Sequence, residues 1–138
     1  MSAHGDNPML FTGSQDKMIR AVILESGIID RAFVASRESI RCLHIQDNLL
    51  FVAGNDPVIR AYDLETGAVK SYDGHQSWIN CMTTYIITDA EGNVKKRWLI
   101  SGSDDKTIKI WDIESRKLLE TLKDLHKNGV TCLTVFNK

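Results

Sequence analysis

Long apolar runs and paired cysteines are missing from this sequence, and each absence excludes a class of protein. No apolar run approaches the roughly 18 residues that predict a membrane-spanning helix. Residues 1–8 are polar and lack the apolar centre of a signal peptide. The three cysteines include no Cys-x-x-Cys pair of the kind that indicates a zinc or redox site. We therefore expect an intracellular protein, cytoplasmic or nuclear, with no membrane partner.

An excess of charge and recognisable catalytic motifs are missing too. The formal net charge is −1, which gives no electrostatic reason to expect a nucleic acid partner. The sequence contains no Gly-rich phosphate loop, no His-Glu-x-x-His motif and no paired-carboxylate site. We therefore predict no catalytic residue, no cofactor and no metal, and expect that the chain is not an enzyme.

The clearest positive signal is the stretch 98–112, WLISGSDDKTIKIWD. Apolar and polar residues alternate over 107–112, a period that is typical of a strand with one buried face. Gly102 and Asp105 belong to the polar turn that precedes this strand. An Asp in such a turn accepts backbone hydrogen bonds and fixes its shape. The stretch therefore predicts a β-hairpin.

The same hairpin pattern occurs earlier, over residues 11–22 and 51–63. An Ile before a basic residue and an Asp in the turn recur in all three copies, at Ile19, Ile59 and Ile108 and at Asp16, Asp56 and Asp105. The copies are spaced by about 40 to 50 residues, which is the period of a repeat architecture.

A second element recurs between the hairpins: Ile40-Arg41-Cys42-Leu43, Ile79-Asn80-Cys81-Met82 and Val130-Thr131-Cys132-Leu133. Each unit then contains four short strands. A period of about 40 to 45 residues with four strands, a Gly-His pair and a Trp-Asp pair is that of a β-propeller blade.

The chain resembles the WD-repeat β-propeller family over residues 9–136, and the third unit carries Gly74-His75, Ser101-Gly102-Ser103 and Trp111-Asp112. In that family each repeat runs in the strand order d-a-b-c, with strand a nearest the axis. The resemblance implies one complete structural tetrad of His75, Asp105, Trp111 and either Ser101 or Ser103. Elsewhere Ser36 replaces the His, and Tyr62 and Val22 replace the Trp. We therefore expect a complete tetrad in one blade only.

We predict an all-β fold of WD-repeat β-propeller blades with four antiparallel strands each. The repeats are expected at residues 9–48, 49–97 and 98–138, after a flexible leader at 1–8. The chain would hold two whole blades and two half blades, a leading b–c pair at 11–24 and a trailing d–a pair at 117–136. The second repeat is longer because of an a–b hairpin tip at 88–97, which we interpret as solvated.

The three cysteines occupy the same position in each repeat, on strand a. Free Cys usually behaves as a small buried hydrophobe, and we expect all three to be reduced and unreactive in the folded protein. His75 and His126 are interpreted as structural partners of a turn Asp, and His44 as a packing or surface residue.

The resemblance implies a protein-interaction scaffold or adaptor that presents the propeller's top face, formed by the d–a and b–c turns, to a protein or peptide partner. The implied contact positions precede the turn Asp, begin strand a, or lie two residues before strand a: Gln15, Asn55, Asp104, Ser39, Trp78, Gly129, Arg37, Gln76 and Lys127. Trp78 is also open to a purely structural interpretation as an edge residue, although Trp is enriched at binding hot spots.

The alternative is a structural segment that only completes a larger or homo-oligomeric ring. Three repeats are fewer than the four to eight blades of usual propellers. Half blades at the two ends would be complementary, so two chains could close a six-bladed ring head to tail. We expect self-association as a homodimer, with a homotrimer or a fragment of a longer propeller as the other possibilities.

Overall fold

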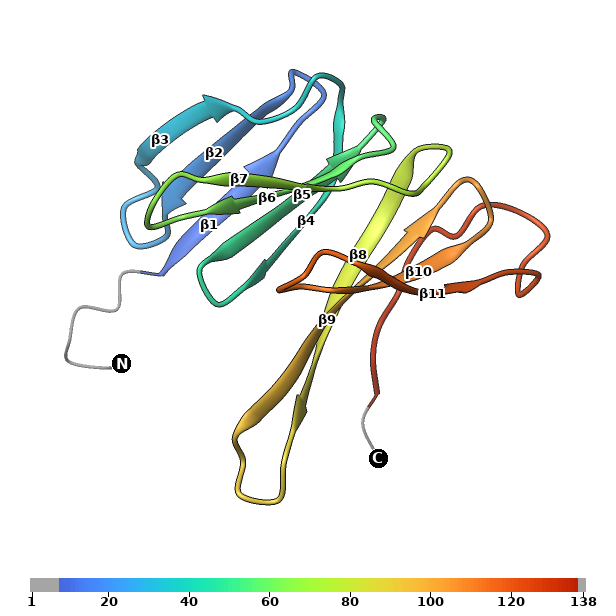
Figure 1. The fold of residues 1–138 in the computed structure, drawn as a ribbon. Coiled ribbons are helices and arrows are strands. Elements are labelled where there is room, and N and C mark those ends of the chain that lie inside the picture. Colours follow the sequence, from blue (N-terminus) through green and yellow to red (C-terminus); the bar gives the residue numbers. More distant parts are fainter. Residues whose placement is uncertain (1–7, 137–138) are drawn as a thin grey trace.

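The computed structural model describes residues 8–136, which form eleven strands and no helix. The predicted leader lies, except for Pro8, outside the described residues. Three antiparallel sheets stand side by side (Figure 1). The strands are β1 (Met9–Gly13), β2 (Met18–Ile23), β3 (Ile29–Val34), β4 (Ile40–Gln46), β5 (Leu49–Gly54), β6 (Ile59–Asp63), β7 (Val69–Tyr72), β8 (Ile79–Thr88), β9 (Val94–Ser103), β10 (Ile108–Asp112) and β11 (Leu118–Leu122). Nothing in the described range could cross a membrane as a helix.

Period-two patterning explains why these segments are strands. Ile19 and Ala21 of β2 are buried while their neighbours are partly exposed, and Ile59 and Ala61 repeat this in β6. Successive side chains of a strand point to opposite faces, so one face of each sheet packs while the other is more open. The turn before β10 contains Lys106 at φ 72°, a left-handed conformation that Lys17 also has in the turn before β2.

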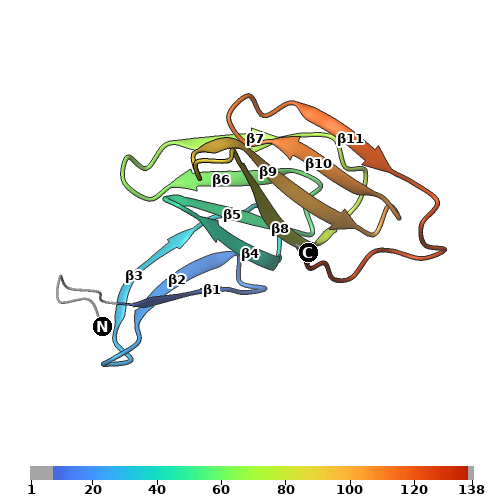
Figure 2. The ribbon, with the colours of Figure 1, turned by 90° about the horizontal axis from the view of Figure 1, so that it is seen from below.

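The sheets have the orders β1-β2-β3, β4-β5-β6-β7 and β8-β9-β10-β11. The all-β class and the two whole blades, the second and third sheets, are confirmed. In Figure 2 the sheets fan out, with β1, β4 and β8 on the inner side and β3, β7 and β11 at the outer ends. Strand a of the family corresponds to β4 and β8, and strand d to β7 and β11.

The two incomplete units differ from the expected half blades. β3 pairs with β2, so the leading sheet has three strands (b, c and d) instead of a b–c pair. β11 pairs with β10, so strand d of the expected trailing pair completes the third sheet. Residues 130–136 follow without forming a strand. The reason is local, because a tight turn after strand c lets strand d fold back onto it at once.

The core lies between neighbouring sheets. Phe51, Tyr72, Leu99 and Trp111 belong to a buried cluster between the second and third sheets. A second cluster around Ile19 joins the first sheet to the second. Each large apolar side chain stabilises the fold by about 1.5–3 kcal/mol when fully buried. Most of the burial is therefore between blades, which fixes how the turns of adjacent blades lie beside one another.

The β8–β9 hairpin is longer than the others, with ten residues in each strand. Figure 1 shows it extending beyond the rest of the molecule, at the end opposite the β5–β6 and β9–β10 turns. Its tip is held by Asp89, whose carboxylate accepts hydrogen bonds from the N–H groups of Glu91 and Asn93 at 2.9 Å each. Gly92 has φ 85° there.

Candidate functional site

A buried hydrogen-bond chain joins the d–a connection to the b–c turn of the third sheet. Trp111 Nε1–H donates to Ser101 Oγ (3.0 Å), and the Ser101 hydroxyl donates to His75 Nε2 (2.6 Å). The His75 Nδ1–H then faces Asp105 Oδ2 at 2.9 Å. This order of donors assigns a neutral imidazole with its proton on Nδ1. The four residues that the family resemblance implies therefore contact one another.

The pKa shifts agree with a neutral His75 and an ionised Asp105. Burial lowers the pKa of His75, and the opposing effect of Asp105 does not restore it. Burial alone would raise the pKa of Asp105, but hydrogen bonds from Thr107, the Gln76 N–H and His75 bring it below its ordinary range. Asp105 thereby fixes the b–c turn through Thr107, and it is also bound by His75 and Gln76 of the preceding d–a connection.

The structure distinguishes the two serines. Ser101 lies inside the chain of four, whereas Ser103 Oγ donates to the carbonyl of Trp78 (2.7 Å) and accepts from the Asp105 N–H (3.1 Å). The expectation that both share a face is compatible with this, since they are two residues apart on β9. Ser101 is fully buried, so its hydroxyl is not available as a nucleophile.

The equivalent turns of the first two sheets use ion pairs instead. Asp16 binds Arg20 and Asp56 binds Arg60, each at 3.0 Å. Tyr62, which stands where Trp111 stands in the third sheet, donates its hydroxyl to the carbonyl of Ala35 (2.6 Å). Within the described residues, the complete chain of four is a feature of the third sheet.

The rim formed by the b–c and d–a turns carries the nine implied contact positions. The structure brings three of them, Asn55, Trp78 and Asp104, into one network. It also places Gly129 against Asp104, where an added Cβ would lie 2.5 Å from the carboxylate Oδ1. The other five lie outside it. The Gln15 carbonyl accepts from Ser39 Oγ (3.5 Å), the Gln76 N–H binds Asp105, Arg37 lines a groove of about 410 Å³ beside Asp56 and Arg60, and Lys127 is exposed.

Two members of the rim network were missed by the sequence reasoning, Arg41 and Asn80. Arg41 Nε donates to Asn80 Oδ1 (2.9 Å), and Arg41 Nη1 donates to Asn55 Oδ1 (3.2 Å). The guanidinium also lies over the ring of Trp78, 5.3 Å from its centroid. Arg41 and Asn80 share one repeat position, between the aliphatic residue and the Cys at the start of strand a. That shared position is the signal that could have found them.

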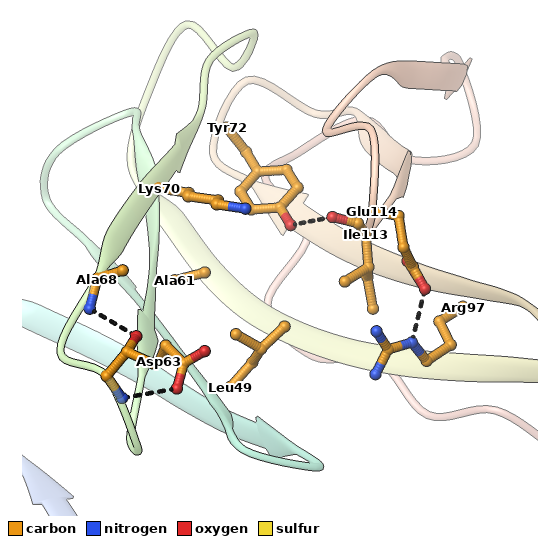
Figure 3. A pocket seen from close by; sticks show the side chains of 10 residues that line it. Leu49, Ala61, Asp63, Ala68, Lys70, Tyr72, Arg97, Ile113 and Glu114 are labelled. Atoms are coloured by element: carbon orange, nitrogen blue, oxygen red, sulfur yellow. Dashed lines mark hydrogen bonds and ion pairs between the residues drawn. The ribbon is translucent and has the colours of Figure 1, made fainter.

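A second hollow lies between the second and third sheets near the c–d turns (Figure 3). It has a volume of about 400 Å³ and is lined by apolar Leu49 and Ile113 and by charged groups. Tyr72 donates its hydroxyl to the Ile113 carbonyl (2.9 Å), and Arg97 binds Glu114 (2.8 Å) and Asp47. These groups hold the two sheets together. Arg97, the last residue of the hairpin tip expected at 88–97, is therefore engaged in ion pairs.

The cysteines have three different environments, which corrects the expectation that all are buried. Burial raises the pKa of Cys42 to about 12 and that of Cys81 to about 11. Cys132 is exposed, because residues 130–136 are not covered by a following strand. No group of three metal-ligating side chains is found within residues 8–136. His126 is also exposed, and the structure shows no Asp partner for it among the described residues.

Comparison with known proteins agrees with this geometry. The family model described as "WD domain, G-beta repeat" matches residues 67–112, the segment that contains all four residues of the tetrad chain. The WD40 β-propeller domain of Doa1 superimposes with a TM-score of 0.73 over 91% of this chain and 40% of that chain, at 22% identity. Residues 67–112 thus match a WD repeat, and the fold is that of part of a WD40 β-propeller.

The chain is also similar to parts of other natural and designed proteins. It is 40% identical over 65 residues to the pre-mRNA-splicing factor PRP46 of Candida glabrata, covering 47% of the chain and 13% of that relative. It is 48% identical over 48 residues to the nuclear distribution protein PAC1 of Candida dubliniensis, covering 35% and 8%. The crystal structure of the computationally designed Ika4 protein matches with a TM-score of 0.74 and 25% identity, over 96% of this chain and 76% of that one. The match thus spans a small part of the curated relatives' length.

Proposed function

We propose that this chain is a non-enzymatic protein-interaction scaffold that binds a protein or peptide partner at the rim of the b–c and d–a turns. The observation that carries the proposal is the Arg41–Trp78 pair. Trp78 is 45% exposed although it stands in an ordered network, and the Arg41 guanidinium lies over it. Trp and Arg are the side chains that most often dominate the binding energy of protein interfaces.

The polar part of the rim supports a protein partner over a small apolar ligand. Arg41, which lies over the aromatic ring, is hydrogen bonded to Asn55, and Asn80 is hydrogen bonded to Asp104. A protein loop offers matching donors and acceptors at such a rim. The network also spans two sheets and reaches the Val130 carbonyl. The names of the relatives, a pre-mRNA-splicing factor and a nuclear distribution protein, support an intracellular location, which we propose together with this role.

The proposal is tested by comparing binding partners captured by rim variants. Trp78→Ala and Arg37→Ala are expected to lose partners that the wild-type chain retains from a cell extract. Val94→Ala is the matched control, because Val94 is 57% exposed at the far end of the long hairpin. Thermal denaturation of each variant must first show an unchanged fold. Partners lost equally in all variants, or in none, would contradict a role for the rim.

The second candidate is a segment that completes a ring. It is favoured by β1, whose inner edge has no strand partner among the described residues, and by residues 130–136, which form no sheet pairing there. An unpaired edge invites the addition of a strand. We propose that residues 130–136 of one chain pair with β1 of another, so that one strand is exchanged instead of the expected d–a pair. A homodimer remains the favoured arrangement, and a homotrimer is the next.

Light scattering on the isolated chain tests this second candidate. The wild-type chain is expected to have the mass of a dimer. Thr134→Pro is expected to have the mass of a monomer, because proline removes an N–H from the added strand. A trimer would keep strand exchange and change the blade number. A stable monomer would exclude self-association as the role of these edges.

A further inference from the structure

Arg41 differs from the other arginines that form polar contacts in residues 8–136. Those arginines each bind a carboxylate: Arg20 with Asp16, Arg31 with Asp30, Arg60 with Asp56, and Arg97 with Asp47 and Glu114. The partners of Arg41 are the neutral amide oxygens of Asn55 and Asn80. An amide positions a guanidinium without cancelling its charge, so Arg41 presents a positive charge that no contacting carboxylate neutralises.

The orientation of Arg41 is set by a relay through Asn80. The Asn80 Nδ2 group donates to Asp104 Oδ1 (2.7 Å) and to the Val130 carbonyl (2.9 Å). Because its amide nitrogen is engaged on that side, its Oδ1 faces Arg41 Nε. With Asn55 holding Nη1, the guanidinium is fixed before any ligand arrives. Groups that are already fixed lose less conformational entropy on binding.

The remaining N–H groups of Arg41 point to a carboxylate. A guanidinium has five N–H donors. Arg41 Nε and Nη1 have acceptors, whereas Nη2 has none among residues 8–136 and is open to a ligand. The planar fork of a guanidinium matches the two oxygens of a carboxylate. The nearest carboxylate in the network, Asp104, is already bound to Asn80.

Trp78 supplies the apolar part of the same surface. Trp78 is 45% exposed as a residue, and the Arg41 guanidinium lies over its ring at 5.3 Å from the centroid. A ligand carboxylate on Arg41 would therefore place its neighbouring residues beside the exposed part of the indole. The site thus combines one fixed cation with one exposed aromatic surface.

We propose that Arg41 and Trp78 form a recognition site for an acidic peptide segment, in which a Glu or Asp carboxylate binds Arg41 and an adjacent apolar side chain packs on Trp78. The proposal rests on the proposed function of the rim and adds the chemistry of the partner. Charge complementarity with Arg41 decides for an acidic segment over a basic one, since a cationic side chain would be repelled from the guanidinium and would disrupt its stacking on Trp78.

The test measures binding of two short capped peptides by fluorescence anisotropy. One has a Glu-Leu-Glu centre and the other the isosteric Gln-Leu-Gln centre. The wild-type chain is expected to bind the Glu peptide with about tenfold lower Kd, the scale of a charge-assisted hydrogen bond. Arg41→Gln should abolish this preference and leave weak binding of both peptides. Arg31→Gln, which removes an exposed arginine of β3, should retain the preference.

The outcomes separate this inference from the proposed function. Equal affinity for both peptides in the wild-type chain, or a preference that survives Arg41→Gln, overturns the acidic recognition. If Trp78→Ala still weakens both peptides in that case, the rim remains a binding surface. If Trp78→Ala changes neither peptide binding nor capture of partners, the proposed function fails as well. Loss of the preference at raised salt in the wild-type chain would support the contact with Arg41.

Discussion

The second and third sheets solve the same structural problem with different chemistry. Both have an Asp in the b–c turn, at Asp56 and Asp105, followed four residues later by a basic residue. Asp56 binds Arg60 in an ion pair, and Asp105 binds His75 from the connection that precedes its own blade. Lys109, the equivalent of Arg60, is left to donate to Thr121 Oγ1 (3.1 Å).

The difference shows what a longer-range partner adds. The Asp56–Arg60 contact joins residues that are four positions apart, so it mainly orders one hairpin. The His75–Asp105 contact joins residues thirty positions apart and is extended by Ser101 to Trp111 in the core. A local pair is formed with little loss of chain entropy, whereas a distant one ties separate segments together and is cooperative with the packing around it.

The largest expected loss of stability concerns the aromatic residues at equivalent positions of the two sheets, Trp111 and Tyr62. Trp111→Ala should destabilise the protein by about 3–5 kcal/mol, because it removes a fully buried ring and leaves the Ser101 hydroxyl without its donor. Tyr62→Ala should cost less, since Tyr62 is only partly buried. Urea denaturation measures both free energies of unfolding. A larger loss for Tyr62→Ala would show that the second sheet depends more on its aromatic residue.

The two turn aspartates give the next effect in size. Asp105→Ala should destabilise by about 1–3 kcal/mol, the cost of leaving buried donors without an acceptor. Asp56→Ala should cost less than about 1 kcal/mol, because a partly exposed ion pair contributes little. Chemical denaturation of the two variants decides the matter, and equal losses would contradict the distinction drawn between the sheets.

Acid should weaken the third sheet through His75 and Asp105. The pKa of His75 is lowered on folding, so the folded state binds fewer protons and the free energy of unfolding falls as the pH drops through the unfolded value of 6.5. The pKa of Asp105 is also lowered, so its contribution is present above its unfolded value of 3.8 and is lost as the pH falls below it.

The measurement is the denaturation midpoint as a function of pH. His75→Gln should show a shallower fall than the wild-type chain as the pH drops below 6.5, the unfolded value for the histidine. Its fall in the more acidic range should remain, since carboxylates still titrate there. Identical pH profiles for the variant and the wild-type chain would show that His75 is not neutral in the folded state.

The smallest effect concerns the cysteines, which occupy one repeat position in three environments. Native-state labelling with a thiol reagent should modify Cys132 quickly, since it is exposed. Cys42 and Cys81 should react only as the protein unfolds, because burial raises the pKa of both thiols and little thiolate is present. Mass spectrometry of labelled peptides gives the three rates, and slow labelling of Cys132 would indicate that residues 130–136 are covered in solution.

Much of the fold could be predicted because it depends on local patterns. Period-two alternation and the spacing of the turn Asp residues were sufficient for the repeats and the two whole blades. The choice of Ser101 over Ser103 was beyond the sequence, because both point to one face of β9 and their partners come from separate segments. Arg41 and Asn80 were missed for the same reason, since they come from different blades and meet only when the two blades pack together.

Patterns along the chain predicted recurring antiparallel β units, and the family resemblance supplied the His, Ser, Asp and Trp set in one of them. Side-chain alternation and turn chemistry act over a few residues, so they can be read along the chain. The positions of Arg97 between two sheets and of the exposed Cys132 became visible only in the tertiary structure. Both outcomes depend on how segments that are distant in the sequence pack against one another. Such packing depends on the shapes of whole blades, so it cannot be read from a few neighbouring residues.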